Sequence, residues 1–209
     1  MGDVAEMMVR PLVAVVDDDD AARVSLARLL DVAEYRSVSF DSGTAFLEWP
    51  EVGAVRCVVT DLQMPGVTGL ELQKALRMRG IDVPMVFVTG FGTVSSSVQA
   101  MRDGAVDFLE KPADPAALLD AVERAVAKGA SLMARAELSG EIRRRQALLT
   151  AREQQVFEGV VQGLPNKQIA AQLGIALKTV KVHRGRVMLK MEAQSVADLV
   201  RFAEALGGS

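Results

Sequence analysis

The chain has 209 residues, of which 50% are hydrophobic and 24% charged. This composition is ordinary for a globular protein, and the length suffices for one large domain or two small ones. No apolar run approaches the roughly 20 residues that span a bilayer, and the first residues lack the apolar core of a secretory signal. The single cysteine, Cys57, excludes a disulfide framework. We therefore expect a cytoplasmic protein that does not associate with a membrane.

The net charge of −3 conceals a division along the chain. Residues 1–140 carry 13 Lys/Arg and 21 Asp/Glu, whereas residues 141–209 carry 11 Lys/Arg and 6 Asp/Glu. The first part is acidic and the second is basic. This asymmetry predicts two modules with different partners, and it makes the basic module a candidate for binding nucleic acid.

The first 127 residues alternate short apolar runs with segments of helical period. The runs, expected to be strands, are residues 12–16, 37–40, 55–60, 85–89 and 105–109. The segments expected to be helices are residues 21–30, 42–49, 70–79, 93–102 and 115–127. Nearly unbroken apolar runs are typical of parallel strands buried on both faces. Five strand–helix units in succession predict an α/β fold with a doubly wound, five-stranded parallel sheet.

Residues 128–146 form a predicted linker. Small and apolar residues recur there at spacings of three and four, which would let the preceding helix extend as a coiled-coil arm. Gly129 and Gly140 each oppose a helix by about 1 kcal/mol. A helical arm and a flexible tether are both compatible with this pattern.

From Thr150 onward the pattern is entirely helical. Four helices are expected, at about residues 151–162, 167–173, 178–191 and 196–206. Their ends are marked by capping boxes at Thr150–Glu153 and Ser195–Asp198, an N-cap at Asn166 and a stop at Gly174. The second and third helices, joined by a tight turn, predict a small all-α helix-turn-helix domain whose second helix enters the major groove of DNA.

Polar residues follow four of the predicted strands. Asp17 and Asp18 come after the first strand, Asp61 after the third, Thr89 at the end of the fourth and Lys111 after the fifth. The carboxyl ends of parallel strands meet at one edge of a sheet, so three carboxylates there predict a Mg²⁺ site. A carboxylate beside Mg²⁺ can accept a phosphoryl group, whose oxygens the lysine and the threonine hydroxyl would stabilise.

The motifs VVDDDD, TDLQMPGVTG, VFVTG and VDFLEKP occur in this order within residues 10–127. In them the sequence resembles the receiver domains of two-component response regulators, which have a flavodoxin-like fold. The resemblance implies phosphorylation of Asp61 and Mg²⁺ binding by Asp17, Asp18, Asp61 and the backbone carbonyl of Gln63. It also implies a switch pair, Thr89 and Phe108, and contact between Lys111 and the phosphoryl group. Of the remaining aspartates, we expect Asp20 to cap the first helix and Asp19 to be solvated.

Two further features bear on the reaction. The only histidine, His183, lies in the basic module, so the phosphoryl group must come from a partner sensor histidine kinase or a small donor. A haloacid-dehalogenase-like phosphatase is the alternative, because its motif also places aspartates after an apolar strand. That motif requires Thr or Val where Ala21 or Ala22 stands, and it leaves DLQMPG unexplained.

The third helix of the basic module carries five Lys/Arg and no acid between Lys178 and Lys190. These cations would neutralise phosphates. Lys181 can reach a base edge, Val182 can touch a thymine methyl, and Gly185 lets the helix lie close to DNA. Residues 147–206 resemble the LuxR-type effector domain of the FixJ/NarL subfamily, in which the last helix mediates dimerisation on DNA. The expected DNA contacts are Asn166, Lys167, Lys178, Thr179, Lys181, Val182, Arg184 and Arg186.

We therefore expect a receiver domain at residues 1–127, a linker at 128–146 and a DNA-binding domain at 147–209. The predicted function is phosphorylation-dependent control of transcription, with a homodimer formed on activation and no catalysis beyond the receiver's own phosphotransfer and dephosphorylation. The alternative is a DNA-binding regulator whose receiver is a fixed dimerisation scaffold and needs no phosphorylation.

Overall fold

The structure is a computed structural model that describes residues 10–90 and 94–207. By its internal contacts the chain divides into two units, residues 1–133 and residues 134–209, each of which has its own core. Across the described ranges, no helix is both long and apolar enough to cross a membrane.

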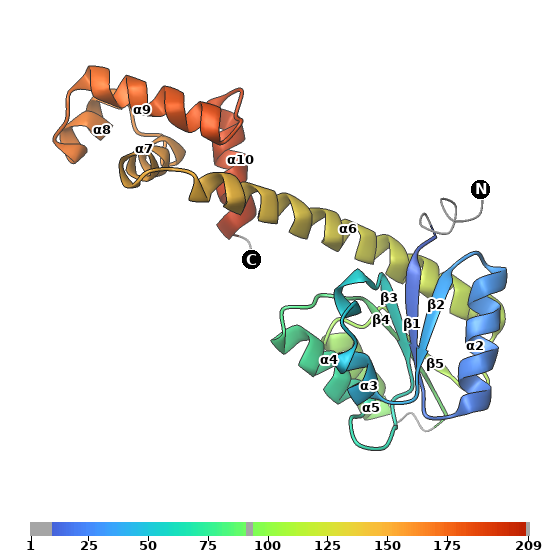
Figure 1. The fold of residues 1–209 in the computed structure, drawn as a ribbon. Helices are drawn as coiled ribbons and strands as arrows, with labels where there is room; N and C mark the ends of the chain where they lie inside the picture. Colours follow the sequence, from blue (N-terminus) through green and yellow to red (C-terminus); the bar gives the residue numbers. More distant parts are fainter. Residues whose placement is uncertain (1–9, 91–93, 208–209) are drawn as a thin grey trace, which may run out of the picture. The chain divides into compact units, whose positions relative to one another are not determined.

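The first unit is built on a five-stranded sheet in which every neighbouring pair is parallel (Figure 1). The strands, in the spatial order β2-β1-β3-β4-β5, are β1 (Leu12–Val16), β2 (Arg36–Phe40), β3 (Cys57–Thr60), β4 (Met85–Thr89) and β5 (Asp107–Glu110). The predicted doubly wound parallel sheet is confirmed.

Helices cover both faces of the sheet (Figure 1). They are α2 (Asp20–Val32), α3 (Gly43–Glu48), α4 (Gly69–Met78), α5 (Val94–Arg102) and α6 (Pro115–Ala147), with a short 3₁₀ turn at Val52–Ala54. Alternate residues of each strand point to opposite faces. Ala14 and Val16 pack with α3, α4 and α5, whereas Val13 and Val15 pack with α2 and α6. The predicted start of the α5 helix, Thr93, lies outside the described residues.

Two strands are displaced from their predicted bounds. Strand β3 begins at Cys57 rather than at residue 55, and β5 begins at Asp107 rather than at residue 105. Val55 and Ala105 are nonetheless buried, at 3% and 7% exposure. An apolar run predicts burial, and here burial extends beyond the residues that pair with a neighbouring strand.

The helix predicted to end at Ala127 continues to Ala147, so the residues predicted as a linker are helical in α6. Gly129, which was expected to oppose this helix, has a packing role. A Cβ atom at this position would lie 2.1 Å from the backbone oxygen of Arg56. The glycine therefore allows α6 to pass directly against that carbonyl, and its energetic cost in the helix is offset by this close packing.

Within residues 134–207, the second unit contains four further helices and the end of α6. The helices are α7 (Ala151–Val161), α8 (Asn166–Leu173), α9 (Leu177–Lys190) and α10 (Val196–Gly207). Their shared core includes Ile142 of α6, Val156, Ile169, Val187 and Leu199. Side chains of this core come from all five helices, as expected for helices too short to be stable alone.

The predicted helix ends in this unit are confirmed with one exception. Both capping boxes are formed, at Thr150–Glu153 and at Ser195–Asp198. Gly174 ends α8 with φ +64°, a left-handed conformation that glycine adopts without steric cost. The exception is Asn166, because α8 is preceded by Pro165 as its N-cap residue and Asn166 is the first residue inside the helix. The proline already fixes the extended backbone that an N-cap needs.

Candidate functional site

Three carboxylates meet at the carboxyl edge of the sheet because of strand register. Val16 of β1 is paired with Thr60 of β3, so the next residues, Asp17 and Asp61, leave the sheet side by side. One oxygen from each of Asp17, Asp18 and Asp61 lies within 4.8 Å of the others. Asp17 and Asp61 are buried, at 1% and 8% exposure, and Asp18 is exposed.

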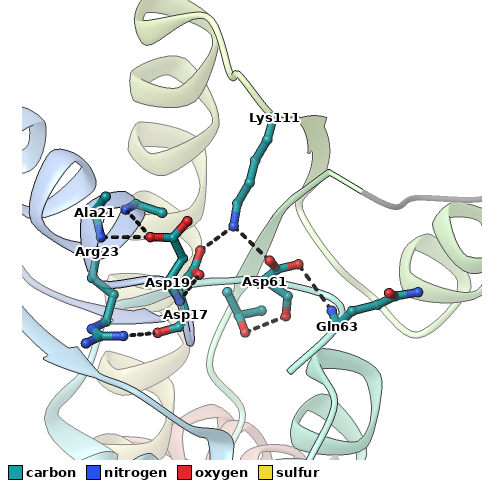
Figure 2. Close-up of polar contacts among 9 residues, drawn as sticks. Asp17, Asp19, Ala21, Arg23, Asp61, Gln63 and Lys111 are labelled. Carbon is teal, nitrogen blue, oxygen red and sulfur yellow. Dashed lines mark hydrogen bonds and ion pairs between the residues drawn. The ribbon is translucent and has the colours of Figure 1, made fainter. Parts of the chain in front are cut away.

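Lys111, just after β5, reaches into this cluster (Figure 2). Its Nζ donates to Asp17 Oδ2 at 2.6 Å and to Asp61 Oδ2 at 2.7 Å. Burial alone would lower the pKa of Lys111, but the hydrogen bonds to Asp17 and Asp61 outweigh it and raise that pKa above its ordinary value. The lysine stays protonated, and its charge offsets part of the repulsion between the carboxylates.

The loop after β1 is held by contacts of Arg23, a residue that was not among those predicted for the site. The carbonyl of Asp17 accepts a hydrogen bond from Arg23 Nη1 at 2.6 Å, and Asp17 Oδ1 accepts one from the Asp19 amide at 2.9 Å (Figure 2). Arg23 also pairs with Asp20. The arginine thus fixes the backbone that carries the buried carboxylate. The acidic and basic residues three positions apart, at 20 and 23, were the available signal.

The prediction that Asp20 caps the first helix was wrong, whereas Asp19 is exposed to solvent as expected. Asp19 is the N-cap of α2, because its side chain accepts hydrogen bonds from the amides of Ala21 and Ala22 at 2.8 and 3.2 Å. The bonds from Ala22 and Ala21 lower the pKa of Asp19. Asp20 is the first residue of the helix. Both residues are acidic and adjacent, so composition alone does not decide which of them adopts the extended backbone of a cap.

The loop after β3 presents Asp61 in a fixed orientation. Asp61 Oδ1 accepts a hydrogen bond from the amide of Gln63 at 3.1 Å, which leaves Oδ2 toward the lysine (Figure 2). Further along, Gly66 has φ +79°, and Thr68 and Glu71 form the capping box that starts α4. A Cβ atom at Gly69 would lie 2.3 Å from the Asp61 backbone oxygen, so α4 begins directly against this loop.

Thr89 lies on β4, the strand next to β3, and Phe108 lies on β5, which pairs with β4 at the edge of the sheet. Thr89 is fully buried at the end of β4, and its carbonyl accepts a hydrogen bond from the amide of Lys111 at 2.9 Å. Phe108 on β5 is half-buried and stacks on Phe87 with ring centroids 6.1 Å apart. Both therefore belong to the strand pair that leads to Lys111.

The donor set at this edge fits a small divalent cation. Carboxylate oxygens are hard ligands, and a Mg²⁺ ion is usually held by one or two of them together with water and phosphate oxygens. Asp17, Asp18 and Asp61 supply such oxygens within 4.8 Å of one another, with Asp18 open to solvent. The ion pairs of Lys111 with Asp17 and Asp61 show that the cluster accepts positive charge.

The second unit presents a cationic helix, α9. Val180 and Val187 are fully buried and anchor the helix in the core. The other side of α9 carries exposed residues that are mostly polar or cationic. Lys178, Thr179, Lys181 and Arg186 are exposed, as are the apolar Val182 and, on α8, Lys167. Lys190 is already engaged, because its Nζ donates to Glu153 Oε2 at 2.6 Å and to the Leu148 carbonyl at 3.0 Å.

Asn166 and Arg184 join α8 to α9. Arg184 Nη1 donates to Asn166 Oδ1 at 2.8 Å, and both residues are half-buried. The structure therefore places both predicted contact residues at the junction of the two helices, where each restrains the other.

Comparison with known families identifies both units. Residues 13–123 match the family model of the response regulator receiver domain, and residues 147–203 match the model of bacterial regulatory proteins of the luxR family. The chain belongs to the response regulator family. Within that family, its C-terminal unit is a LuxR-type DNA-binding domain.

Several relatives and solved structures match nearly the whole length of the chain. It is 45% identical to the transcriptional regulatory protein FixJ of Azorhizobium caulinodans, over 93% of this chain and 92% of the relative. It is 40% identical to nodulation protein W of Bradyrhizobium diazoefficiens, over 97% and 89%. Among solved structures, response regulator StyR has a TM-score of 0.78 at 41% identity, covering 94% of this chain and 99% of that one. The chain is thus a FixJ-like transcriptional regulator.

Proposed function

We propose that this response regulator is switched by phosphorylation of Asp61, with a partner sensor histidine kinase as donor and Mg²⁺ as cofactor, and that it thereby controls promoter DNA binding. The observation that carries the proposal is the position of the Asp61 carboxylate. It lies among three carboxylates within 4.8 Å of one another and has a lysine ammonium 2.7 Å away.

The chemistry is an in-line transfer to one oxygen of Asp61. That oxygen forms a bond to phosphorus while the bond from phosphorus to the donor atom breaks, and the electron pair of the broken bond stays with the donor. Mg²⁺, when bound, would neutralise phosphoryl oxygens and be held by Asp17, Asp18, Asp61 and the Gln63 carbonyl.

The protein's own side chains hold the acceptor and the product. The Gln63 amide fixes Asp61 Oδ1. Lys111 contacts Oδ2 in the unmodified protein, so a phosphoryl group on that oxygen would meet the ammonium directly. Thr89, buried at the end of the neighbouring strand, would donate its hydroxyl to the group, and Phe108 would repack as Thr89 moved.

The output is DNA binding by the LuxR-type domain. Lys167, Lys178 and Arg186 would contact phosphates, as would Thr179. Lys181 and Val182 would meet base edges, and Asn166 and Arg184 would steady the approach of α9. We assign residues 1–127 to the receiver, 128–146 to a linker and 147–209 to the DNA-binding domain, and we propose that the phosphorylated protein is a homodimer.

The second candidate is a receiver that serves only as a fixed dimerisation scaffold. It predicts that Asp61 is never modified. The intact mass of the protein after incubation with Mg²⁺ and acetyl phosphate separates the two candidates. We expect one added phosphoryl group on the wild type and none on Asp61→Asn. If neither protein is modified, with acetyl phosphate or with candidate kinases, the scaffold replaces the switch.

A further inference from the structure

A groove lies between α4 and α5 in the receiver. Its volume is about 550 Å³, within the roughly 300–1,000 Å³ typical of sites for small molecules. Leu70, Gln73, Lys74 and Met78 of α4 line it, together with Gln99 of α5. These residues are different from those of the acidic edge, so the groove is a separate feature of the receiver.

The lining of the groove is mainly apolar. Leu70 is half-buried and Met78 is 79% exposed. Residues 70, 74 and 78 follow one another at spacings of four, so their side chains lie on one face of α4. Between the two apolar residues, the alkyl chain of Lys74 can cover apolar surface while its ammonium stays in water. This face of α4 can therefore hold an apolar body.

The charged groups at the rim already have partners or are hydrated. Glu71 belongs to the capping box that starts α4. Arg77 pairs with Asp103 at 3.8 Å, and Asp103 Oδ2 accepts a hydrogen bond from Gln99 Nε2 at 2.6 Å. Lys74 is exposed to solvent. A ligand of this groove therefore needs no charge of its own.

The polar group that lacks a partner is the side-chain oxygen of Gln73. This residue is 7% exposed and lines both the groove and a neighbouring cavity of about 150 Å³. Its Nε2 donates to the carbonyls of Ala100 and Asp103 at 3.5 and 3.0 Å. Both partners are acceptors, so the nitrogen must face them and the orientation of the amide is fixed. Oε1 is buried, and no residue in the described part of the chain donates a hydrogen bond to it.

We propose that this groove binds a small neutral molecule that has an apolar body and one N–H or O–H donor. The body lies against Leu70 and Met78, and the donor bonds to Gln73 Oε1. A buried acceptor without a donor costs free energy, so a ligand that supplies the donor is favoured over one that does not. The inference concerns a ligand site in the receiver and depends neither on phosphorylation nor on DNA binding.

Indole and 1-methylindole are matched probes, because a methyl group in the second replaces the N–H donor of the first. Amide chemical shifts of the ¹⁵N-labelled full-length protein, followed during titration with each probe, give both affinities. We expect indole to shift amides of α4 and α5 and to bind about tenfold more tightly than 1-methylindole, the factor expected for one hydrogen bond to a buried acceptor.

Three variants assign the binding to the groove. Gln73→Leu keeps the apolar volume and removes the acceptor, so it should bind the two probes equally. It also removes the hydrogen bonds to Ala100 and Asp103, so a second variant leaves those bonds intact. Met78→Glu places a charge in the groove and should weaken both probes about tenfold. Met101→Glu is the matched control, because Met101 is 47% exposed on α5 and does not line the groove. It should leave both affinities unchanged.

The outcomes decide the inference. Equal affinities of the two probes for the wild type would overturn recognition by Gln73 Oε1, and equal effects of Met78→Glu and Met101→Glu would overturn the groove as the site. The absence of any shift in α4 and α5 up to millimolar indole would overturn the inference as a whole. A preference for indole that Gln73→Leu abolishes, with both probes weakened by Met78→Glu alone of the two methionine variants, would confirm it.

Discussion

At the carboxyl edge of the sheet, the negative charge of two buried carboxylates is offset by the positive charge of one lysine. Asp17 and Asp61 are buried side by side, and the ammonium of Lys111 lies between them at 2.6 and 2.7 Å. Two neighbouring buried carboxylates repel each other unless a cation is present. In the protein without metal, the ammonium of Lys111 therefore offsets this repulsion. In the metal-loaded protein, Mg²⁺ would offset it as well.

Lys111→Met should reveal this balance. Without the ammonium, the paired carboxylates repel in Mg²⁺-free buffer, and we expect the free energy of unfolding to fall by about 1–3 kcal/mol. Added Mg²⁺ should raise the melting temperature of the variant more than that of the wild type. Calorimetry with and without Mg²⁺ measures both effects.

The control for Lys111→Met is Lys128→Met, which removes an exposed lysine of the same unit. It should change neither the melting temperature nor its response to Mg²⁺ appreciably. An equal response to Mg²⁺ in Lys111→Met and the wild type would contradict the balance between lysine and carboxylates.

At the scale of elements, α6 shows how a glycine can mark a contact instead of a helix end. Gly129 lies against the Arg56 carbonyl, and Gly140 has open space around its Cβ position. Both belong to the same helix, so their helix propensities are equal and only their surroundings differ. Substitutions at these two glycines therefore separate the effect of packing on stability from the effect of helix propensity.

Gly129→Ala should destabilise the first unit, because the added Cβ atom would overlap the backbone oxygen of Arg56. Relieving that overlap would require α6 or the Arg56 backbone to move. The expected loss is about 1–3 kcal/mol, the usual penalty for overpacking. Gly140→Ala should instead stabilise its helix by about 1 kcal/mol. Urea denaturation of the full-length variants tests both, and equal effects of the two substitutions would refute the packing role of Gly129.

A second contact between elements makes the LuxR-type domain sensitive to acid. Lys190 on α9 and the capping contacts at Thr150 lower the pKa of Glu153 on α7 to about 2, from an ordinary value of 4.5. A carboxyl whose pKa is lower in the folded state stabilises the fold above its unfolded pKa, and this contribution is lost as the pH falls from about 4.5 toward 2.

Glu153→Gln should therefore lower the melting temperature at neutral pH, and the difference from the wild type should shrink as the pH falls through this window. Circular dichroism melts across the pH range measure the difference. Glu158→Gln, an exposed residue of the same helix, is the control and should show little dependence. A Glu153→Gln deficit that persists unchanged at pH 2 would show that the charge is not the source of stability.

At the scale of the whole molecule, phosphorylation of the acidic receiver must be thermodynamically coupled to DNA binding by the basic domain if phosphorylation controls transcription. Such coupling is reciprocal for binding equilibria. If a phosphoryl group on Asp61 favours the DNA-bound protein, then DNA must favour the phosphorylated state by the same factor.

This reciprocity can be measured with beryllium fluoride, a non-covalent mimic of the phosphoryl group. We expect the mimic to raise DNA affinity by about 5- to 150-fold, and DNA to raise the affinity for the mimic equally. Titrations monitored by anisotropy and by calorimetry give the two factors. Asp61→Asn should show neither, and two independent affinities in the wild type would favour the scaffold alternative.

Much of the molecule was predictable because its signals are local or follow from topology. Apolar runs of strand length and helical segments between them predict the parallel sheet. The topology of such a sheet then brings Asp17, Asp61 and Lys111 to one edge. The division of charge between the two parts and the tight turn at Gly174 predict a separate helical, basic module.

Some features were decided only by the tertiary structure. They depend on contacts between residues distant in sequence, or on which of two chemically equivalent neighbours takes a given role. The sequence by itself determined the fold class, the two modules and the residues available at the acidic edge. The structure decided that Asp19 and not Asp20 caps α2, and that Arg23 holds the Asp17 carbonyl. It also decided that Gly129 continues a helix, because the carbonyl that makes glycine necessary belongs to Arg56, more than seventy residues earlier in the chain. Local propensity cannot contain that information, since the partner atom is supplied only by the folded chain.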